Sequence, residues 1–239
     1  MPLVILWALT LTAQLLGLAY GVAQAGRSVA PVILPSAMVL SLVTLPLASL
    51  GLFLGPRTGL GAPLLMDLLD NAPGAGARLL KSALVACLLG LMFGAAMVGL
   101  RLVLLPYLPP DMPVLGFRGA LGGLLVSVAA AIGEEVWFRL GLMTLLVWGV
   151  SRLLRQATPH PAVIWGIIVL TAVAFGMSHL PQLASFDAAT PFSVWGTILG
   201  NCLVGSLYGW LYWRRGLLAA MVGHFSVDLV IHVLPALFR

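Results

Sequence analysis

Two adjacent glutamates interrupt an apolar stretch near the middle of the chain, SVAAAIGEEVWFRLGLMTLLVWG at residues 127–149. Glu134 and Glu135 are the only glutamates in the sequence, and Arg139 follows within the same stretch. An ionised side chain at the centre of a membrane helix costs about 2.5–3.5 kcal/mol on insertion scales. These three side chains together would therefore cost roughly 8–10 kcal/mol if none of them were paired. We therefore expect them to face the interior of a helix bundle or a wet cavity.

Helical spacing separates the two carboxylates. Glu135 and Arg139 stand at i and i+4 with the acid on the N-terminal side, the favourable order for an ion pair. Glu134 lies about 100° round the helix, and Trp137 and Phe138 occupy its i+3 and i+4 positions in place of a base. The spacing predicts a neutralised, supporting Glu135 and a Glu134 without a local counter-ion, which suits a general base. The alternative is a buried ion-pair cluster that only locks helices together, and for Glu135–Arg139 it is at least as well supported.

Two further polar pairs lie at helical spacing on later apolar segments. FGMSHL places Phe175 and His179 at i and i+4, and GHFSVDL places His224 and Asp228 likewise. A single histidine in an apolar helix is ordinarily a packing residue. Two histidines and an aspartate, together with the glutamate pair, are harder to explain by packing, because ionisable groups inside a membrane are costly. The two histidines without such neighbours are interpreted as structural or interfacial: His160 and His232.

These side chains must be positioned by membrane-spanning helices. Of the 239 residues, 61% are hydrophobic and 8% are charged, whereas soluble domains carry roughly 25% charged residues. Apolar runs of about 20 residues can each cross a bilayer. The sequence therefore predicts an all-α, polytopic transmembrane helix bundle of about seven spans, within a range of six to eight. The expected spans are Leu3–Ala25, Pro31–Leu54, Ala83–Leu105, Ala120–Val150, Ala162–Leu180, Ser193–Trp213 and Leu217–Phe238.

We expect a single integral membrane domain over residues 1–239, with N-terminal spans in residues 1–105 and a candidate interfacial helix within residues 55–80. Ala120–Val150 exceeds one perpendicular crossing, so it should tilt, kink near its two glycines at 122–123, or project from the bilayer. Gly205 and Gly209, beside Asn201, predict close helix packing.

The three motifs, in this order on successive apolar segments, resemble the CPBP family, the CAAX-protease and bacteriocin-processing (Abi) glutamic intramembrane endopeptidases. EEVWFR matches EExxxR, FGMSH matches FxxxH and HFSVD matches HxxxD. The resemblance covers residues 118–237, which would form a CPBP-like protease core. Members of the family cleave peptide bonds at or within the membrane, and the eukaryotic ones remove the last three residues of prenylated proteins.

The resemblance implies a role for each motif residue. Glu134 would activate the hydrolytic water, and His179 would hold that water with it. His224 and Asp228 would stabilise the oxyanion. Many members have Asn where this chain has Asp228, and an ionised carboxylate cannot donate a hydrogen bond, so Asp228 must be protonated or must instead orient His224. The supporting residues would be Glu135, Arg139 and Phe175.

The expected activity is that of an intramembrane endopeptidase acting on a membrane-associated or lipidated protein or peptide. Peptide hydrolysis needs an activated water and donors for the oxyanion, and the sequence contains neither GxSxG nor HExxH. We expect no cofactor. A metal is the runner-up, in a zinc-dependent membrane peptidase whose ligands would be glutamate and two histidines.

A non-enzymatic transporter, proton relay or scaffold is the other alternative. A relay should show broken helices and internal repeats, but no repeat is apparent and the prolines cluster in the predicted connections. The expected partners are a protein or peptide substrate at the membrane and the lipid bilayer, with no nucleic acid. The expected location is a bacterial cytoplasmic membrane, with multiple passes.

Overall fold

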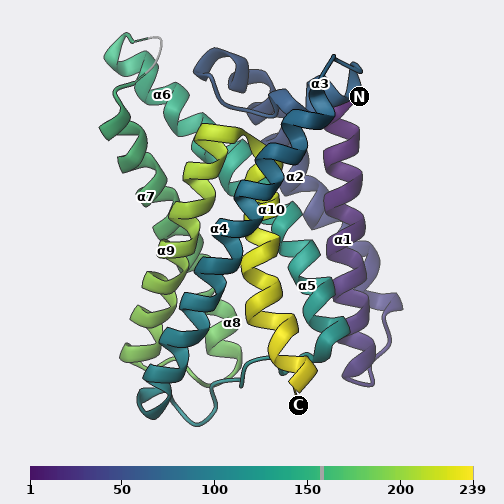
Figure 1. The fold of residues 1–239 in the computed structure, drawn as a ribbon. Helices are drawn as coiled ribbons and strands as arrows, with labels where there is room; N and C mark the ends of the chain where they lie inside the picture. The colour runs from purple at the N-terminus through teal and green to yellow at the C-terminus, as the bar shows by residue number, and fades with distance from the viewer. Residues whose placement is uncertain (157–158, 239) are drawn as a thin grey trace.

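A computed structural model describes residues 1–156 and 159–238, which form a bundle of long, roughly parallel helices (Figure 1). These residues contain no strand, and the all-α fold is confirmed. The long helices are α1 (Pro2–Gln24), α2 (Ala30–Thr58), α4 (Ala75–Leu104), α5 (Gly119–Glu134), α6 (Thr144–Leu154), α7 (Pro161–Ser178), α9 (Pro191–Arg215) and α10 (Leu217–Asp228). The π-helical segment η2 (Glu135–Met143) joins α5 to α6 without a break. The shorter elements are α3 (Pro63–Leu69), α8 (Leu180–Ser185), the 3₁₀ turns η1 (Leu105–Tyr107) and η4 (Leu234–Phe238), and the π-helical η3 (Leu229–Val233).

Six helical segments of the described chain are long and apolar enough to cross a membrane, as an integral membrane protein requires. They are Pro2–Gln24, Ala30–Thr58, Ala75–Tyr107, Gly119–Leu154, Pro161–Ser185 and Leu217–Phe238. The one remaining expected span, Ser193–Trp213, corresponds to α9, which has 25 residues but is not among these six. The count therefore lies within the predicted range of six to eight.

Helix α10 lies in the middle of the bundle, where it packs against α4, α9 and α5 (Figure 1). Helix α1 packs on α5 and α2, α7 packs on α9, and α2 packs on η2. The segments that carry the three motifs are thus brought together around α10, and helices from the N-terminal half cover them.

Glycines permit the closest of these helix contacts. A Cβ on Gly51 of α2 would collide with the backbone oxygen of Leu140 in η2, and one on Gly90 of α4 would collide with the backbone oxygen of Gly223 in α10. Small residues at such crossings let two helix backbones approach closely within a membrane. The positions of η2 and α10 therefore depend on glycines in α2 and α4.

The pair Gly205 and Gly209 packs α9 closely against α7. A Cβ on Gly205 would lie 3.1 Å from the Cβ of Ala172, and one on Gly209 would lie 2.9 Å from Cγ2 of Ile168. This is the close packing that the small-residue spacing predicts. Nearby, the Asn201 amide donates to the carbonyl of Thr197 at 2.9 Å.

Two details of the helices differ from expectation. Helix α2 contains Pro35, Pro46 and Pro56 within its 29 residues, so the expectation that prolines lie in connections is wrong for this helix. Transmembrane helices tolerate proline because neighbouring groups satisfy the freed backbone carbonyls. The two glycines at 122–123 lie inside regular α5, and the irregular geometry falls instead at η2.

Candidate active site

The two glutamates lie where α5 gives way to the π-helical segment. Glu134 is the last residue of α5 and Glu135 is the first of η2. A π-helix bonds each N–H to the carbonyl five residues back, and such segments are rare and frequent at functional sites. The π-helical segment therefore coincides with the first motif.

A chain of hydrogen bonds holds the middle of η2. The Thr144 hydroxyl donates to the carbonyl of Arg139 at 3.2 Å and lies 2.6 Å from the Tyr212 hydroxyl oxygen. Because Thr144 has one proton, Tyr212 is the donor in that second bond. The Tyr212 oxygen in turn accepts from the backbone N–H of Gly61 at 2.8 Å. Helix α9 and the segment after α2 thus fix the backbone that carries Arg139.

Glu135 is fully buried and contacts a partner through each oxygen. Oε2 lies 3.4 Å from Nε of Arg139, and Oε1 accepts from Nδ1 of His224 at 2.9 Å. The guanidinium of Arg139 also donates to the carbonyl of Gly205 at 2.9 Å and lies over the Phe175 ring. The carboxylate therefore joins η2, α9 and α10 in one charged cluster.

His224 occupies the centre of the site. Its ring stacks on Tyr208, with 4.3 Å between ring centres and 12° between planes. Because Nδ1 is bonded to Glu135, Nε2 is the nitrogen left for chemistry. Nε2 lies 3.8 Å from Oε2 of Glu134 and 3.6 Å from Oδ2 of Asp228. His224 thus has a carboxylate on its Nδ1 side and two on its Nε2 side.

Glu134 differs from its fully buried neighbour in lining the cavity. Its side chain is 23% exposed, and Oε2 is buried yet makes no hydrogen bond to any residue that the structure describes. A buried carboxylate oxygen needs a hydrogen-bond donor to offset its desolvation. Water or a substrate group in the adjoining cavity is the available source of that donor.

His179 lies at the end of α7 with one ring nitrogen already bonded. Its Nδ1 lies 2.8 Å from the carbonyl oxygen of Phe175. A carbonyl can only accept, so Nδ1 carries a proton and Nε2 of the neutral ring is an acceptor. The Phe175 ring, which is 1% exposed, packs edge-on against the imidazole with ring centres 4.8 Å apart. His179 can therefore accept a proton or a hydrogen bond through Nε2.

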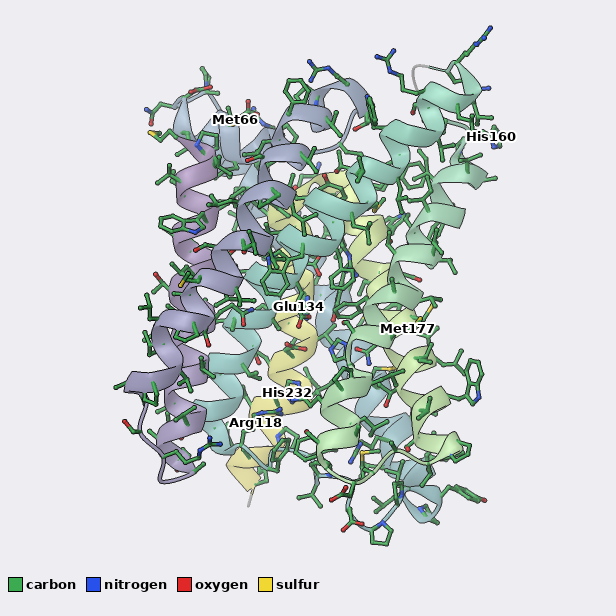
Figure 2. The ribbon with its side chains drawn as sticks, turned by 180° about the vertical axis from the view of Figure 1, so that it is seen from behind. Met66, Arg118, Glu134, His160, Met177 and His232 are labelled. Atoms are coloured by element: carbon green, nitrogen blue, oxygen red, sulfur yellow. The ribbon has the colours of Figure 1, made fainter. Side chains whose placement is uncertain are left out.

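A cavity of about 490 Å³ brings these groups together. Glu134, His179, His224 and Asp228 all line it, from α5, α7 and α10. Figure 2 shows Glu134 about midway along the bundle, far from both ends. The four residues for which the sequence predicts catalysis therefore share one polar space within the bundle.

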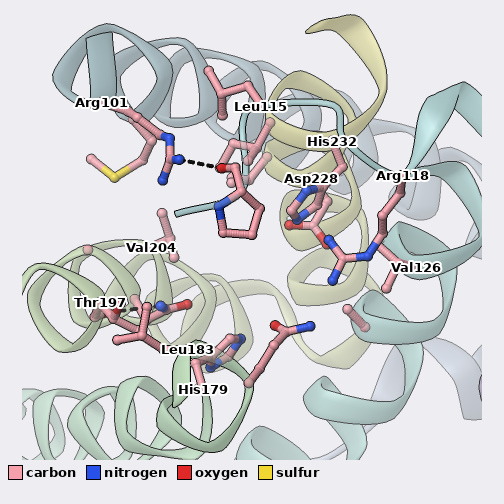
Figure 3. A pocket seen from close by; sticks show the side chains of 18 of the residues that line it. Arg101, Leu115, Arg118, Val126, His179, Leu183, Thr197, Val204, Asp228 and His232 are labelled. Atoms are coloured by element: carbon pink, nitrogen blue, oxygen red, sulfur yellow. Dashed lines mark hydrogen bonds between the residues drawn. The ribbon is translucent and has the colours of Figure 1, made fainter. Parts of the chain in front are cut away.

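Further polar side chains line the same cavity on the side toward the C-terminus. Arg118, His232 and Asp228 face His179 across the opening (Figure 3), and Arg118 lies at the start of α5, nearer the end of the bundle (Figure 2). Burial lowers the pKa of Arg118, and the charge of Asp228 opposes that effect. This wall of the cavity therefore places a guanidinium group near the carboxyl group of Asp228.

Sequence reasoning missed several of these groups. His232 lines the cavity, although its isolation in the sequence favoured a structural or interfacial place. His160, by contrast, is structural as expected, because it caps α7 by accepting from the N–H of Ala162 at 3.2 Å. The bond between Glu135 and His224 and the stacked Tyr208 were not anticipated either. The one available signal was a tyrosine within an apolar helix, the fourth residue of GSLYG.

The described residues include no group of three or more histidine, cysteine, aspartate or glutamate side chains arranged to hold a metal ion. The imidazole and carboxylate groups of the cavity instead contact one another through hydrogen bonds and close charges. The site's own residues can supply a base and donors for hydrolysis.

Comparison with known families agrees with this geometry. Residues 116–230 match the family described as type II CAAX prenyl endopeptidase, Rce1-like. This segment of the chain is therefore similar to the CAAX-protease family. The Rce1-like segment runs from the loop before α5 into η3 and contains all three motifs. No curated protein and no solved structure matches the chain.

The matched segment indicates the general activity. The Rce1-like segment is that of an intramembrane CAAX-type endopeptidase, and the six apolar helical segments agree with an integral membrane protein. A protein substrate at the membrane follows from the same assignment. The family match does not by itself identify the residues that act on the peptide bond.

Proposed function

We propose that the chain is a glutamic-type intramembrane endopeptidase in which Glu134, with His179, activates a water molecule. The observation that supports the proposal is the difference between the surroundings of the two adjacent glutamate side chains. The Glu135 side chain is fully buried and its oxygens lie within 3.4 Å of Arg139 or His224. The Glu134 side chain is 23% exposed and lines the cavity, and its Oε2 makes no hydrogen bond to any described residue. A general base needs an accepting oxygen within reach of the water.

The proposed reaction proceeds without a covalent enzyme intermediate. Water lies between Glu134 and Nε2 of His179, and its oxygen attacks the scissile carbonyl carbon while its proton passes to the Glu134 carboxylate. The carbonyl π electrons move to oxygen, and Nε2 of a doubly protonated His224 donates to that oxyanion. When the C–N bond breaks, the proton on Glu134 passes to the leaving amine.

We also propose that the substrate is a membrane-bound peptide with a free C-terminus and that no metal takes part. The substrate class follows the family to which residues 116–230 belong. The cavity reaches the level of Glu134, midway along the bundle, so the cleaved segment must enter the interior. Comparing the cleavage of prenylated and unprenylated peptides measures the contribution of a prenyl group.

The test is cleavage of a CAAX-terminated peptide in detergent or nanodiscs, with the products identified by mass spectrometry. Glu134→Gln keeps the shape of the side chain but removes the acceptor. We expect peptide binding to persist and turnover to fall by at least the roughly 10²–10⁴-fold that general base catalysis contributes. Full activity in Glu134→Gln would exclude the glutamic mechanism.

Two controls separate the alternatives. Glu135→Gln, matched for folded protein, should lose less activity than Glu134→Gln, because its carboxylate contacts Arg139 and His224 rather than the cavity. A chelator should leave the wild type active, whereas activity lost to chelator and restored by zinc would support a metallopeptidase. If no peptide is cleaved but liposomes show proton flux that depends on Glu134, the relay alternative replaces the protease.

A further inference from the structure

Tyr208 of α9 forms part of the cavity wall directly beside His224. The residue is 1% exposed, its ring is stacked on the imidazole, and it lines the cavity. No side-chain hydrogen bond within the described part of the chain involves its hydroxyl, and the hydroxyl is not among the fully enclosed polar atoms that lack a partner. A buried tyrosine hydroxyl usually finds a partner, so a hydroxyl that adjoins the cavity is available to a substrate group.

Tyr212, one helical turn later on α9, shows what a structural tyrosine looks like in this bundle. It is also 1% exposed. Its hydroxyl both donates and accepts, with Thr144 and the N–H of Gly61 as partners. The two tyrosines therefore share a helix, a depth of burial and a chemistry, but one hydroxyl is occupied and the other is not.

The proposed reaction needs hydrogen-bond donors at the oxyanion. Asp228 carries a carboxyl group, and an ionised carboxylate accepts but does not donate. His224 can supply one donor through Nε2, since its Nδ1 is bonded to Glu135. A second, neutral donor on the same wall would supply what Asp228 in its ionised form cannot.

We propose that the Tyr208 hydroxyl donates a hydrogen bond to the oxyanion formed at the scissile carbonyl, which makes Tyr208 a further catalytic residue. The inference rests on the proposed function. The proton stays on the phenol oxygen throughout, so no additional acid or base is required. The ring is stacked on His224 with its centre 4.3 Å from the imidazole centre, and both residues line the same cavity. In the proposal, one carbonyl oxygen bound there accepts from both.

Tyr208→Phe tests this, because it keeps the stacked ring and removes only the hydroxyl. We expect kcat to fall about 10²-fold, the order found when one oxyanion-hole donor is removed, with KM and the melting temperature close to wild type. A kcat within about twofold of wild type would overturn the proposal. So would a loss that follows the folded fraction or appears in KM alone.

Tyr212→Phe is the matched control. It also removes one hydroxyl from a buried ring of α9, but outside the cavity lining. It should lower the melting temperature while leaving kcat per folded molecule unchanged. If both variants lose kcat equally, the effect is a general one of α9 and the assignment to Tyr208 fails.

The double variant Tyr208→Phe/Asp228→Asn tests whether Tyr208→Phe loses activity because a hydrogen-bond donor is removed. An amide at position 228 can donate, so kcat should recover in part over Tyr208→Phe alone, whereas no recovery would count against donation as the role. If Tyr208→Phe does not fold, 3-fluorotyrosine placed at position 208 keeps the shape and strengthens the donor. An unchanged kcat in that variant would overturn the proposal.

These outcomes are separable from failure of the proposed function. Activity that survives Glu134→Gln removes the glutamic mechanism whatever Tyr208 does. An inactive Glu134→Gln beside a fully active Tyr208→Phe keeps the mechanism and removes only the role of the hydroxyl.

Discussion

Glu134 and Glu135 show how one position along a helix decides what a buried carboxylate can do. Glu135 faces Arg139 on one side and His224 on the other, so its charge is balanced. Glu134 faces the cavity, and its Oε2 has no protein donor among the described residues. We therefore propose that the same chemical group supports the site at one position and acts on water at the next.

Arg139→Ala should destabilise the protein strongly. The variant leaves the fully buried Glu135 without its cationic partner and removes the bond to the carbonyl of Gly205. Breaking a buried pair costs roughly 3–5 kcal/mol, which should appear as a large fall in melting temperature in detergent. Arg152→Ala, on an exposed turn at the end of α6, is the matched control. A melting temperature unchanged in Arg139→Ala would contradict the buried pairing.

At the residue scale, the sequence predicts which polar groups belong to the site better than how they are connected. The cost of ionisable side chains in a membrane singles out Glu134, His179, His224 and Asp228, and all four line one cavity. The bond from Glu135 to His224 joins residues 89 positions apart, and helical spacing carries no information about such pairs. Tyr208 was missed for a similar reason, since a tyrosine in an apolar helix is ordinarily interpreted as a packing residue.

At the scale of the element, hydrophobic run length located the helices but not their irregularities. Each expected span coincides with a helix of the structure, because span length is set by bilayer thickness. The π-helical segment η2 and the three prolines within α2 could not be read from run length. The π-helical segment is held by hydrogen bonds outside its own backbone, such as those of Thr144 and Tyr212.

The contact between α4 and α10 provides a test at this scale. Gly90→Ala would place a methyl group against the backbone of Gly223 and the Cβ of Ser226. Since α10 carries His224 and Asp228, we expect a stability loss of about 1–3 kcal/mol from overpacking and a parallel loss of cleavage. Thermal unfolding and peptide turnover measure the two effects.

Gly99→Ala is the matched control on the same helix, because a Cβ there meets nothing within 4 Å. Alanine is the better helix former by about 0.5–1 kcal/mol, so this variant should be neutral or slightly stabilised. Equal behaviour of the two variants would show that the close crossing of α4 and α10 is not required.

At the scale of the whole molecule, the Rce1-like residues 116–230 are supported by helices that lie outside them. The Gln14 amide of α1 donates to the carbonyl of Ala129 at 3.0 Å, and the Trp137 indole donates to the hydroxyl of Thr44 at 2.9 Å. Helix α2 contacts η2, and α4 contacts α10. The N-terminal helices therefore hold the two elements that carry Glu135 and His224.

We accordingly expect residues 111–239 expressed alone to fail to fold, and to recover when residues 1–110 are co-expressed as a separate chain. The cut falls in the irregular connection after η1, so it breaks no helix, while the contacts of α1, α2 and α4 can reform between fragments. Co-purification through a tag on one fragment, followed by thermal unfolding and peptide cleavage, measures reassembly. A cut after Asn201, within α9, should not be rescued, because it divides a helix that bears Gly205 and Tyr208. If residues 111–239 alone were monodisperse and active, the helices of residues 1–105 would not be needed to hold the site, and the origin of its geometry would lie within the Rce1-like segment.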